Sequence, residues 1–222
     1  MRPVQITIEI PGVTVGVITV EEAQVALTTP ELFGEMDAVC ERFRRELTVE
    51  GVAELEAISA VRRMFRAWGV DPARYRPASE ALLRRVVQGK GLYRVSNVVD
   101  IINLGSIETG WPYGTYDVAH VAPPVAFRMG AAGETYEGIG RHVWHLEGRP
   151  VLADARGPFG GPVSDSTRTM ITEATRSVLT TIFAPAGSST AAIQQALERV
   201  GERLARFADG RVSSSAIIHR SA

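Results

Sequence analysis

Apolar and polar residues alternate at the start of the chain. Residues 4–20 show this period of two on both sides of Pro11-Gly12, which predicts two half-buried strands around a turn. The first ten residues therefore indicate a strand rather than a secretory signal. Later apolar segments, divided by glycine and proline, predict further strands: Val125–Met129, Glu134–Tyr136, His142–Leu146, Val151–Asp154, Thr167–Thr172, Val178–Phe183 and Arg211–His219.

Other segments have the apolar spacing of amphipathic helices. They run from Met36 to Leu47, from Leu55 to Trp68, from Pro77 to Val87 and from Ser189 to Phe207. Gly69 and Gly89 stand where C-terminal caps are expected. Because helices and strands mix without a repeat or a long linker, we expect one α+β domain over residues 1–222.

The segment Arg94–Val118 places short polar side chains in an apolar background. Asn97, Asp100, Asn103 and Ser106 recur every three residues among valine, isoleucine and leucine. Short polar groups beside a core usually hold a structure or a ligand in place. Asn97 and Asp100 either form a helix capping box or belong to a site. Steps of three residues turn the stripe by about 60° each on a helix, so only neighbouring pairs can act together.

Composition is that of an ordinary globular protein. The chain has 222 residues, 45% of them hydrophobic and 22% charged, and no apolar run approaches the ~18 residues of a membrane span. The lone Cys40, which helical spacing places in the core, excludes an internal disulfide and a multi-cysteine zinc site. A reduced, cytoplasmic setting is therefore expected.

No metal or other cofactor is expected. His142 and His145 are three residues apart, so on a strand they point to opposite faces. A pair of histidines also falls short of the three protein ligands of a catalytic zinc site.

Charge is unevenly distributed although the net charge is −1. Residues 31–57 carry eight acidic and three basic side chains, whereas residues 62–94 carry nine basic and two acidic ones. The basic stretch is either a phosphate-binding face or one of two solvated helices of opposite charge. On its helix we expect Ser79, Glu80, Arg84 and Arg85 to lie on the exposed face.

Glycine is concentrated between residues 157 and 162. This Gly-Pro-Phe-Gly-Gly-Pro loop requires unusual backbone angles or the close approach of a ligand. Neither this loop nor Gly138-Ile139-Gly140 completes a dinucleotide or Walker motif. The following segment, Ser164–Thr169, contains Asp165 and Arg168 and is either a turn bonded to its own backbone or part of a site.

Three segments, Tyr75–Arg85, Asn97–Asn103 and Gly110–Asp117, together resemble the tRNA-editing module of the beta subunit of phenylalanyl-tRNA synthetase, the fused B-three/B-four domain. Gly160-Gly161 and Asp165–Thr172 fit its second half. The resemblance covers residues 60–185 and leaves no room for the other domains of the synthetase. The chain therefore resembles a freestanding member of that group.

The resemblance implies an α+β module with a pocket between two halves, where the ester joining a wrong amino acid, tyrosine, to tRNA is hydrolysed. Such editing is needed because an apolar pocket rejects a near-isostere only weakly. The expected catalytic residues are Asn97, Asp100, Asn103 and Asp117. The expected substrate-binding residues are Ser106, Tyr113, Gly114, Tyr116, Gly160, Gly161, Asp165 and Arg168. The expected RNA-binding residues are Arg76, Arg84 and Arg85.

Two positions depart from the family pattern. Bacterial synthetases commonly place a histidine where this chain aligns Gly114, and a glutamate near Thr180 or Thr181. Either the substrate has changed or hydrolysis is lost, although a positioned water and backbone donors can still support ester hydrolysis.

Three functions follow as hypotheses. The leading one is a freestanding hydrolase that deacylates mischarged tRNA, with aminoacyl-tRNA as its partner. The alternative is a non-catalytic module that binds tRNA or an amino-acid-like ligand. The third is hydrolysis of a small amino-acid ester or amide. The oligomeric state and the amino acid recognised stay open.

Overall fold

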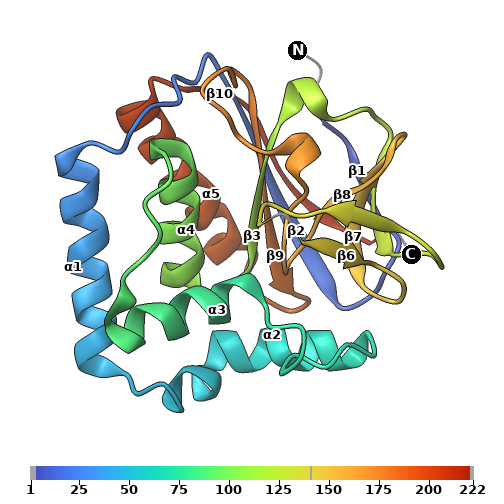
Figure 1. The fold of residues 1–222 in the computed structure, drawn as a ribbon, viewed down its shortest axis with the longest axis horizontal. Helices are drawn as coiled ribbons and strands as arrows, with labels where there is room; N and C mark the ends of the chain where they lie inside the picture. The colour runs from blue at the N-terminus through green and yellow to red at the C-terminus, as the bar shows by residue number, and fades with distance from the viewer. Residues whose placement is uncertain (1–3, 141, 221–222) are drawn as a thin grey trace.

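Two four-stranded sheets form the centre of the molecule, and helices cover one of them (Figure 1). The computed structural model describes residues 4–140 and 142–220. The strands are β1 (Ile6–Ile8), β2 (Val13–Glu21), β3 (Tyr113–Asp117), β4 (Val125–Met129), β5 (Thr135–Glu137), β6 (Val143–His145), β7 (Pro150–Asp154), β8 (Gly157–Gly160), β9 (Val178–Pro185) and β10 (Arg211–His219). The helices are α1 (Pro30–Glu46), α2 (Glu56–Ala67), α3 (Ala78–Arg85), α4 (Asn97–Thr109) and α5 (Thr190–Ala208), with short turns η1 (Gly51–Glu54), η2 (Val86–Lys90), η3 (Val118–His120) and η4 (Thr167–Thr169).

The two sheets differ in strand direction. The antiparallel sheet has the order β10-β2-β9-β3, and each strand runs antiparallel to the strands beside it. The mixed sheet has the order β1-β4-β7-β8, in which β1 and β4 are parallel. Strands β5 and β6 form a separate hairpin. This is the α+β architecture that the sequence predicts.

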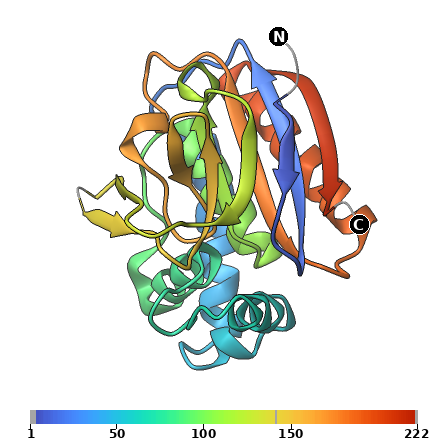
Figure 2. The ribbon, with the colours of Figure 1, turned by 90° about the vertical axis from the view of Figure 1, so that its right-hand side faces the viewer.

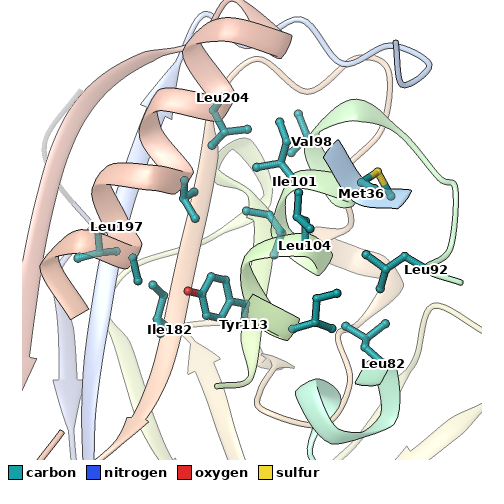
Figure 3. Packing of buried hydrophobic residues seen from close by; sticks show 14 of the residues in the cluster. Met36, Leu82, Leu92, Val98, Ile101, Leu104, Tyr113, Ile182, Leu197 and Leu204 are labelled. Atoms are coloured by element: carbon teal, nitrogen blue, oxygen red, sulfur yellow. The ribbon is translucent and has the colours of Figure 1, made fainter. Parts of the chain in front are cut away.

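Two apolar cores lie on the two sides of the antiparallel sheet. The first core lies between that sheet and α1, α4 and α5, and Figure 3 shows part of it around Ile101, Leu104 and Tyr113. The second core joins the two sheets and α2 through residues such as Phe65, Tyr116 and Phe127. Figures 1 and 2 show the resulting order: helices, antiparallel sheet, mixed sheet. In the part of the chain described, no helix is long and apolar enough to cross a membrane.

Most of the predicted elements form, but the first two strands are not a hairpin. β1 pairs with β4, in the register Ile6↔Val125, whereas β2 pairs with β9 and β10. Pro11-Gly12 therefore carries the chain from one sheet to the other. Residues 1–3 of the predicted first strand lie outside the described residues.

Three local predictions are wrong. The strand expected over Thr167–Thr172 begins instead with the 3₁₀ turn η4, because the Ser166 hydroxyl accepts a hydrogen bond from the Arg168 backbone N–H at 3.0 Å. The glycine-rich loop at 157–162 includes strand β8. Ser96, rather than Asn97, caps α4 by accepting a hydrogen bond from the Val99 N–H.

Candidate functional site

Asn97 is buried and ties distant parts of the chain together. Its Oδ1 accepts hydrogen bonds from the backbone N–H groups of Ala26 (3.0 Å) and Val98 (2.8 Å). Its Nδ2 donates to the carbonyl oxygens of Gln24 (2.9 Å) and Phe207 (2.8 Å). With four bonds to backbone, this amide has the geometry of a structural anchor.

The carboxyl groups of Asp100 and Asp117 are also used by the protein itself. Asp100 accepts from the Thr28 hydroxyl at 2.6 Å and from the Val95 N–H at 2.9 Å, and burial raises its pKa. Asp117 accepts from the Thr175 hydroxyl at 2.7 Å and from the Ala119 N–H at 2.9 Å. These bonds hold the start of α4 and the end of β3.

Ser106 and Asn103, the other two residues of the polar stripe in α4, do not join a shared site with Asn97 and Asp100. Ser106 donates to the Trp111 carbonyl at 2.8 Å, which secures the turn after the helix. Asn103 is half-buried, and its side chain forms no hydrogen bond within the described residues. The structure thus does not bring Asn97, Asp100, Asn103 and Asp117 together around one cleft.

Strand β3 directs neighbouring side chains to opposite sides of the antiparallel sheet. Tyr113 packs in the first core, where its hydroxyl lies 3.4 Å from the Thr109 hydroxyl. Tyr116 packs in the second core and meets Phe159 edge-on, with ring centroids 4.9 Å apart. Tyr113 therefore belongs to the helical side, whereas Tyr116 belongs to the side that faces the mixed sheet.

Five of the predicted substrate-binding residues converge on that second side. The Tyr116 hydroxyl donates to Asp165 Oδ1 at 2.9 Å, and the Gly161 N–H donates to the same oxygen at 3.3 Å. Gly114 and Gly160 lie directly against the Tyr116 ring. We call Gly114, Tyr116, Gly160, Gly161 and Asp165, together with Thr181, the Tyr116–Asp165 cluster.

The glycines of the cluster make room for a side chain of the protein. A Cβ on Gly114 would overlap the Tyr116 hydroxyl, and a Cβ on Gly160 would stand 2.6 Å from that oxygen and from Asp165 Oδ1. A Cβ on Gly161 would stand 2.8 Å from the Pro150 carbonyl oxygen. The groups that approach these glycines closely are therefore the Tyr116 side chain and neighbouring strands of the protein itself.

Burial changes the acid–base properties of the cluster. Burial raises the pKa of Asp165 to about 7, although the Tyr116 hydroxyl and the N–H groups of Gly161 and Thr115 act in the other direction. Burial and the charge of Asp165 raise the pKa of Tyr116 well above its ordinary value. Tyr116 hence keeps its proton, whereas Asp165 exchanges one near neutral pH.

Thr181 is a member of the cluster that was not among the predicted site residues. It is the direct partner of Gly114 in the β3–β9 ladder, and its Oγ1 would be 3.1 Å from a Cβ at position 114. This oxygen is buried, and it interacts with the Tyr116 hydroxyl, which lowers the pKa of Tyr116 slightly against the larger effect of burial. The pair Thr180-Thr181 in an otherwise apolar strand was the signal in the sequence.

Tyr136 extends the cluster toward the β5–β6 hairpin. Its hydroxyl donates to the Ser164 carbonyl at 2.7 Å, and burial raises its pKa. Beside it lies a cavity of about 20 Å³ that Trp144 and Gly161 also line. Such a volume holds about one water molecule.

The predicted RNA-binding arginines have different environments. Ser79 and Glu80 are fully buried, contrary to the expected exposed face. Glu80 is surrounded by Arg62, whose Nη1 lies 2.8 and 3.0 Å from its oxygens, by Arg84 at 3.0 Å and by Arg76 at 3.6 Å. A buried carboxylate requires such partners, so much of the basic stretch serves the fold.

Arg85 is the third predicted RNA-binding arginine, whereas Arg168 was predicted to bind substrate. Arg85 lies over the Tyr93 ring, with 4.0 Å from its Cζ to the ring centroid. Arg168 binds both oxygens of Asp154, at 2.9 and 3.0 Å, and also the carbonyls of His120 and Gly157. Arg168 therefore joins η3, β7 and η4 rather than the Tyr116–Asp165 cluster.

Comparison with known proteins gives one family match. The family described as the B3/4 domain matches residues 60–217, and no curated protein matches. Among solved structures, an N-terminal fragment of the phenylalanyl-tRNA synthetase beta-subunit from Pyrococcus horikoshii is similar, with a TM-score of 0.48 and 14% identity. That match covers 97% of this chain and 55% of the fragment.

Proposed function

This chain belongs to the B3/4 domain family, and from that premise we propose that it hydrolyses the ester of a mismatched amino acid on tRNA. The observation that carries the proposal is the Asp165 carboxyl group, which has a pKa of about 7 and is held by Tyr116. Its partner Tyr116 lies against Gly114, which aligns with the histidine of bacterial synthetases, and Thr181 lies beside Gly114; the glutamate of those synthetases aligns near Thr180 or Thr181. On this proposal, Asp165 transfers the proton in place of the histidine and glutamate that this chain lacks.

Asp165 is suited to act as a general base. A group whose pKa is close to the working pH combines a large ionised fraction with useful basicity. The Asp165 carboxylate would take a proton from a water molecule as its oxygen attacks the ester carbonyl. The proton then passes to the departing ribose oxygen, which gives a free amino acid and a free hydroxyl on the tRNA. Tyr116 and Gly161 both bond Oδ1 and so fix the carboxyl plane.

A second candidate function is binding without hydrolysis. The specific observation in its favour is the Tyr116 hydroxyl, which occupies the space that a side chain at position 114 would need. On this alternative, Thr181 and Asp165 hold an amino-acid-like group or the end of a tRNA without transferring a proton.

Deacylation assays separate the two functions. We expect the protein to release the amino acid from at least one member of a panel of mischarged tRNAs faster than buffer does. Asp165→Asn should lower this rate about a hundredfold, the usual contribution of a general base. The rate of the wild-type protein should rise with pH through about 7 as Asp165 ionises.

The matched control is Glu173→Gln, which removes the charge of an exposed carboxyl group outside the cluster and should leave the rate unchanged. Deacylation at the buffer rate with every tRNA would contradict hydrolysis. Binding of tRNA that weakens steeply with salt would then support the second function.

A further inference from the structure

An open basic cavity of about 400 Å³ lies between α1 and the loop that precedes α4, on the helical side of the molecule. We call it the Arg85 cavity. It is lined by Met36, Asp37, Cys40, Arg85, Lys90, Gly91, Leu92, Tyr93 and Arg94. Three cations and one carboxylate give this lining a net of two positive charges. The Tyr116–Asp165 cluster lies on the other side of the antiparallel sheet.

Arg85 differs from its neighbour Arg84. Arg84 shares the Glu80 carboxylate with Arg62 and Arg76, whereas the Arg85 guanidinium group lies over the Tyr93 ring and pairs with no carboxylate among the described residues. Its Nε is buried and has no hydrogen-bond partner among residues 4–140 and 142–220. A buried, charged donor without a partner is unfavourable, and an anion in the cavity, which Arg85 lines, would compensate the charge of the guanidinium group.

The other cations of the cavity are also weakly engaged. Lys90 donates to the neutral side-chain oxygen of Gln88 at 3.1 Å. Arg94 lies 3.5 Å from Asp37, and both side chains are more than half exposed. Exposed pairs of this kind are worth little, so both cations remain available to a ligand.

The floor of the cavity adds no negative charge. Burial raises the pKa of the Cys40 thiol, which therefore stays neutral, and Met36 and Leu92 are apolar. The wall offers an aromatic ring, because Tyr93 is 52% exposed although Arg85 covers part of it. The cavity thus combines positive charge with a flat apolar surface.

We propose that the Arg85 cavity binds the phosphate group of a nucleotide, either free or within an RNA strand, and that the base stacks on Tyr93. Guanidinium groups suit phosphate because they present several donors in one plane, and nucleobases of any sequence stack on aromatic rings. The volume lies in the range of small-ligand sites. This proposal does not depend on hydrolysis at the Tyr116–Asp165 cluster.

Calorimetric titration tests the site with AMP, adenosine, inorganic phosphate and a short single-stranded oligoribonucleotide. AMP should bind saturably and more tightly than adenosine or phosphate. Arg85→Gln should weaken AMP binding about tenfold, since a charge-assisted contact is lost. Tyr93→Leu should weaken AMP binding at least about fivefold and leave phosphate binding unchanged.

Arg156→Gln is the control, because it removes one exposed positive charge at the turn between β7 and β8. It should leave AMP binding unchanged. Tighter binding of the oligoribonucleotide than of AMP identifies an RNA strand as the source of the phosphate, and equal binding identifies a free nucleotide. Asp165→Asn should retain AMP binding, which separates this test from that of hydrolysis.

Two results would overturn the proposal. One is the absence of saturable binding of both AMP and the oligoribonucleotide at millimolar concentration by the folded wild-type protein. The other is an equal loss of affinity in Arg85→Gln and Arg156→Gln, which would indicate general charge attraction.

Discussion

The polar residues around Asn97 and those around Tyr116 lie on different sides of the antiparallel sheet, and their hydrogen bonds differ in kind. The Asn97 side chain bonds only to backbone groups, and three of its four bonds join distant segments of the fold. Tyr116 bonds to the Asp165 side chain in a confined space, next to the buried Thr181 hydroxyl. The Asn97 amide is therefore structural, whereas Asp165, whose pKa burial raises to about 7, is the candidate for proton transfer.

The largest expected effect on stability comes from a substitution that crowds the Tyr116 hydroxyl. Gly114→Ala should lower the free energy of unfolding by more than about 3 kcal/mol, because the new methyl group overlaps Tyr116. Adding Tyr116→Phe should recover part of this loss, since the hydroxyl is the nearest atom. Gly34→Ala in α1, where a Cβ meets nothing within 4 Å, should instead stabilise by about 0.5–1 kcal/mol. Denaturant unfolding measures all three; a Gly114→Ala protein as stable as the wild type would contradict the packing.

Removal of the Asn97 amide comes next. Asn97→Ala should cost about 3 kcal/mol of unfolding free energy, because four backbone groups lose a partner in a buried place. Asn103→Ala, six residues further along the same polar stripe, should change it by less than about 0.5 kcal/mol. Equal effects of the two substitutions would mean that the four Asn97 hydrogen bonds add no more to the free energy of unfolding than the unbonded Asn103 side chain does.

A smaller effect is expected in the pH dependence of stability. Asp165 has a pKa of about 7 in the folded protein, above the 3.8 of an ordinary aspartate, so the folded state favours its protonated form. Its stabilising contribution is present below pH 3.8 and is lost as pH rises through about 7. Because the side chain keeps some access to water, we expect a loss of about 2 kcal/mol. Asp165→Asn should remove this dependence, and the difference between the two unfolding profiles measures it.

Elements of the fold with a regular local pattern were predictable. β4 and β10 have the predicted bounds, and α5 starts next to Ser189, where the helix was predicted to begin. Pairing was not predictable in the same way, since β1 finds its partner β4 across more than a hundred residues. Glu80 shows the same limit: its burial depends on Arg62, which comes from another helix.

The site was predictable only as far as it depends on residue type, because the partners of its side chains come from distant parts of the chain. The glycines and Asp165 stand out by composition and by the family resemblance, and they do come together. The sequence places Asn97 beside a core but does not show what it bonds, because Gln24 and Phe207 are 73 and 110 residues away. Structural polar residues such as Asn97 and candidate site residues such as Asp165 therefore could not be distinguished from the sequence, because it does not show their hydrogen-bond partners.

The room taken by the Tyr116 ring also constrains how this chain and its relatives diverge. Positions 114, 116 and 160 meet at one hydroxyl, so a chain with this backbone accommodates either a tyrosine at 116 or a larger residue at 114, but not both. Substitutions at these positions should accordingly be correlated across the family, with glycine at 114 accompanying tyrosine at 116. A histidine at position 114 would therefore require a residue smaller than tyrosine at position 116.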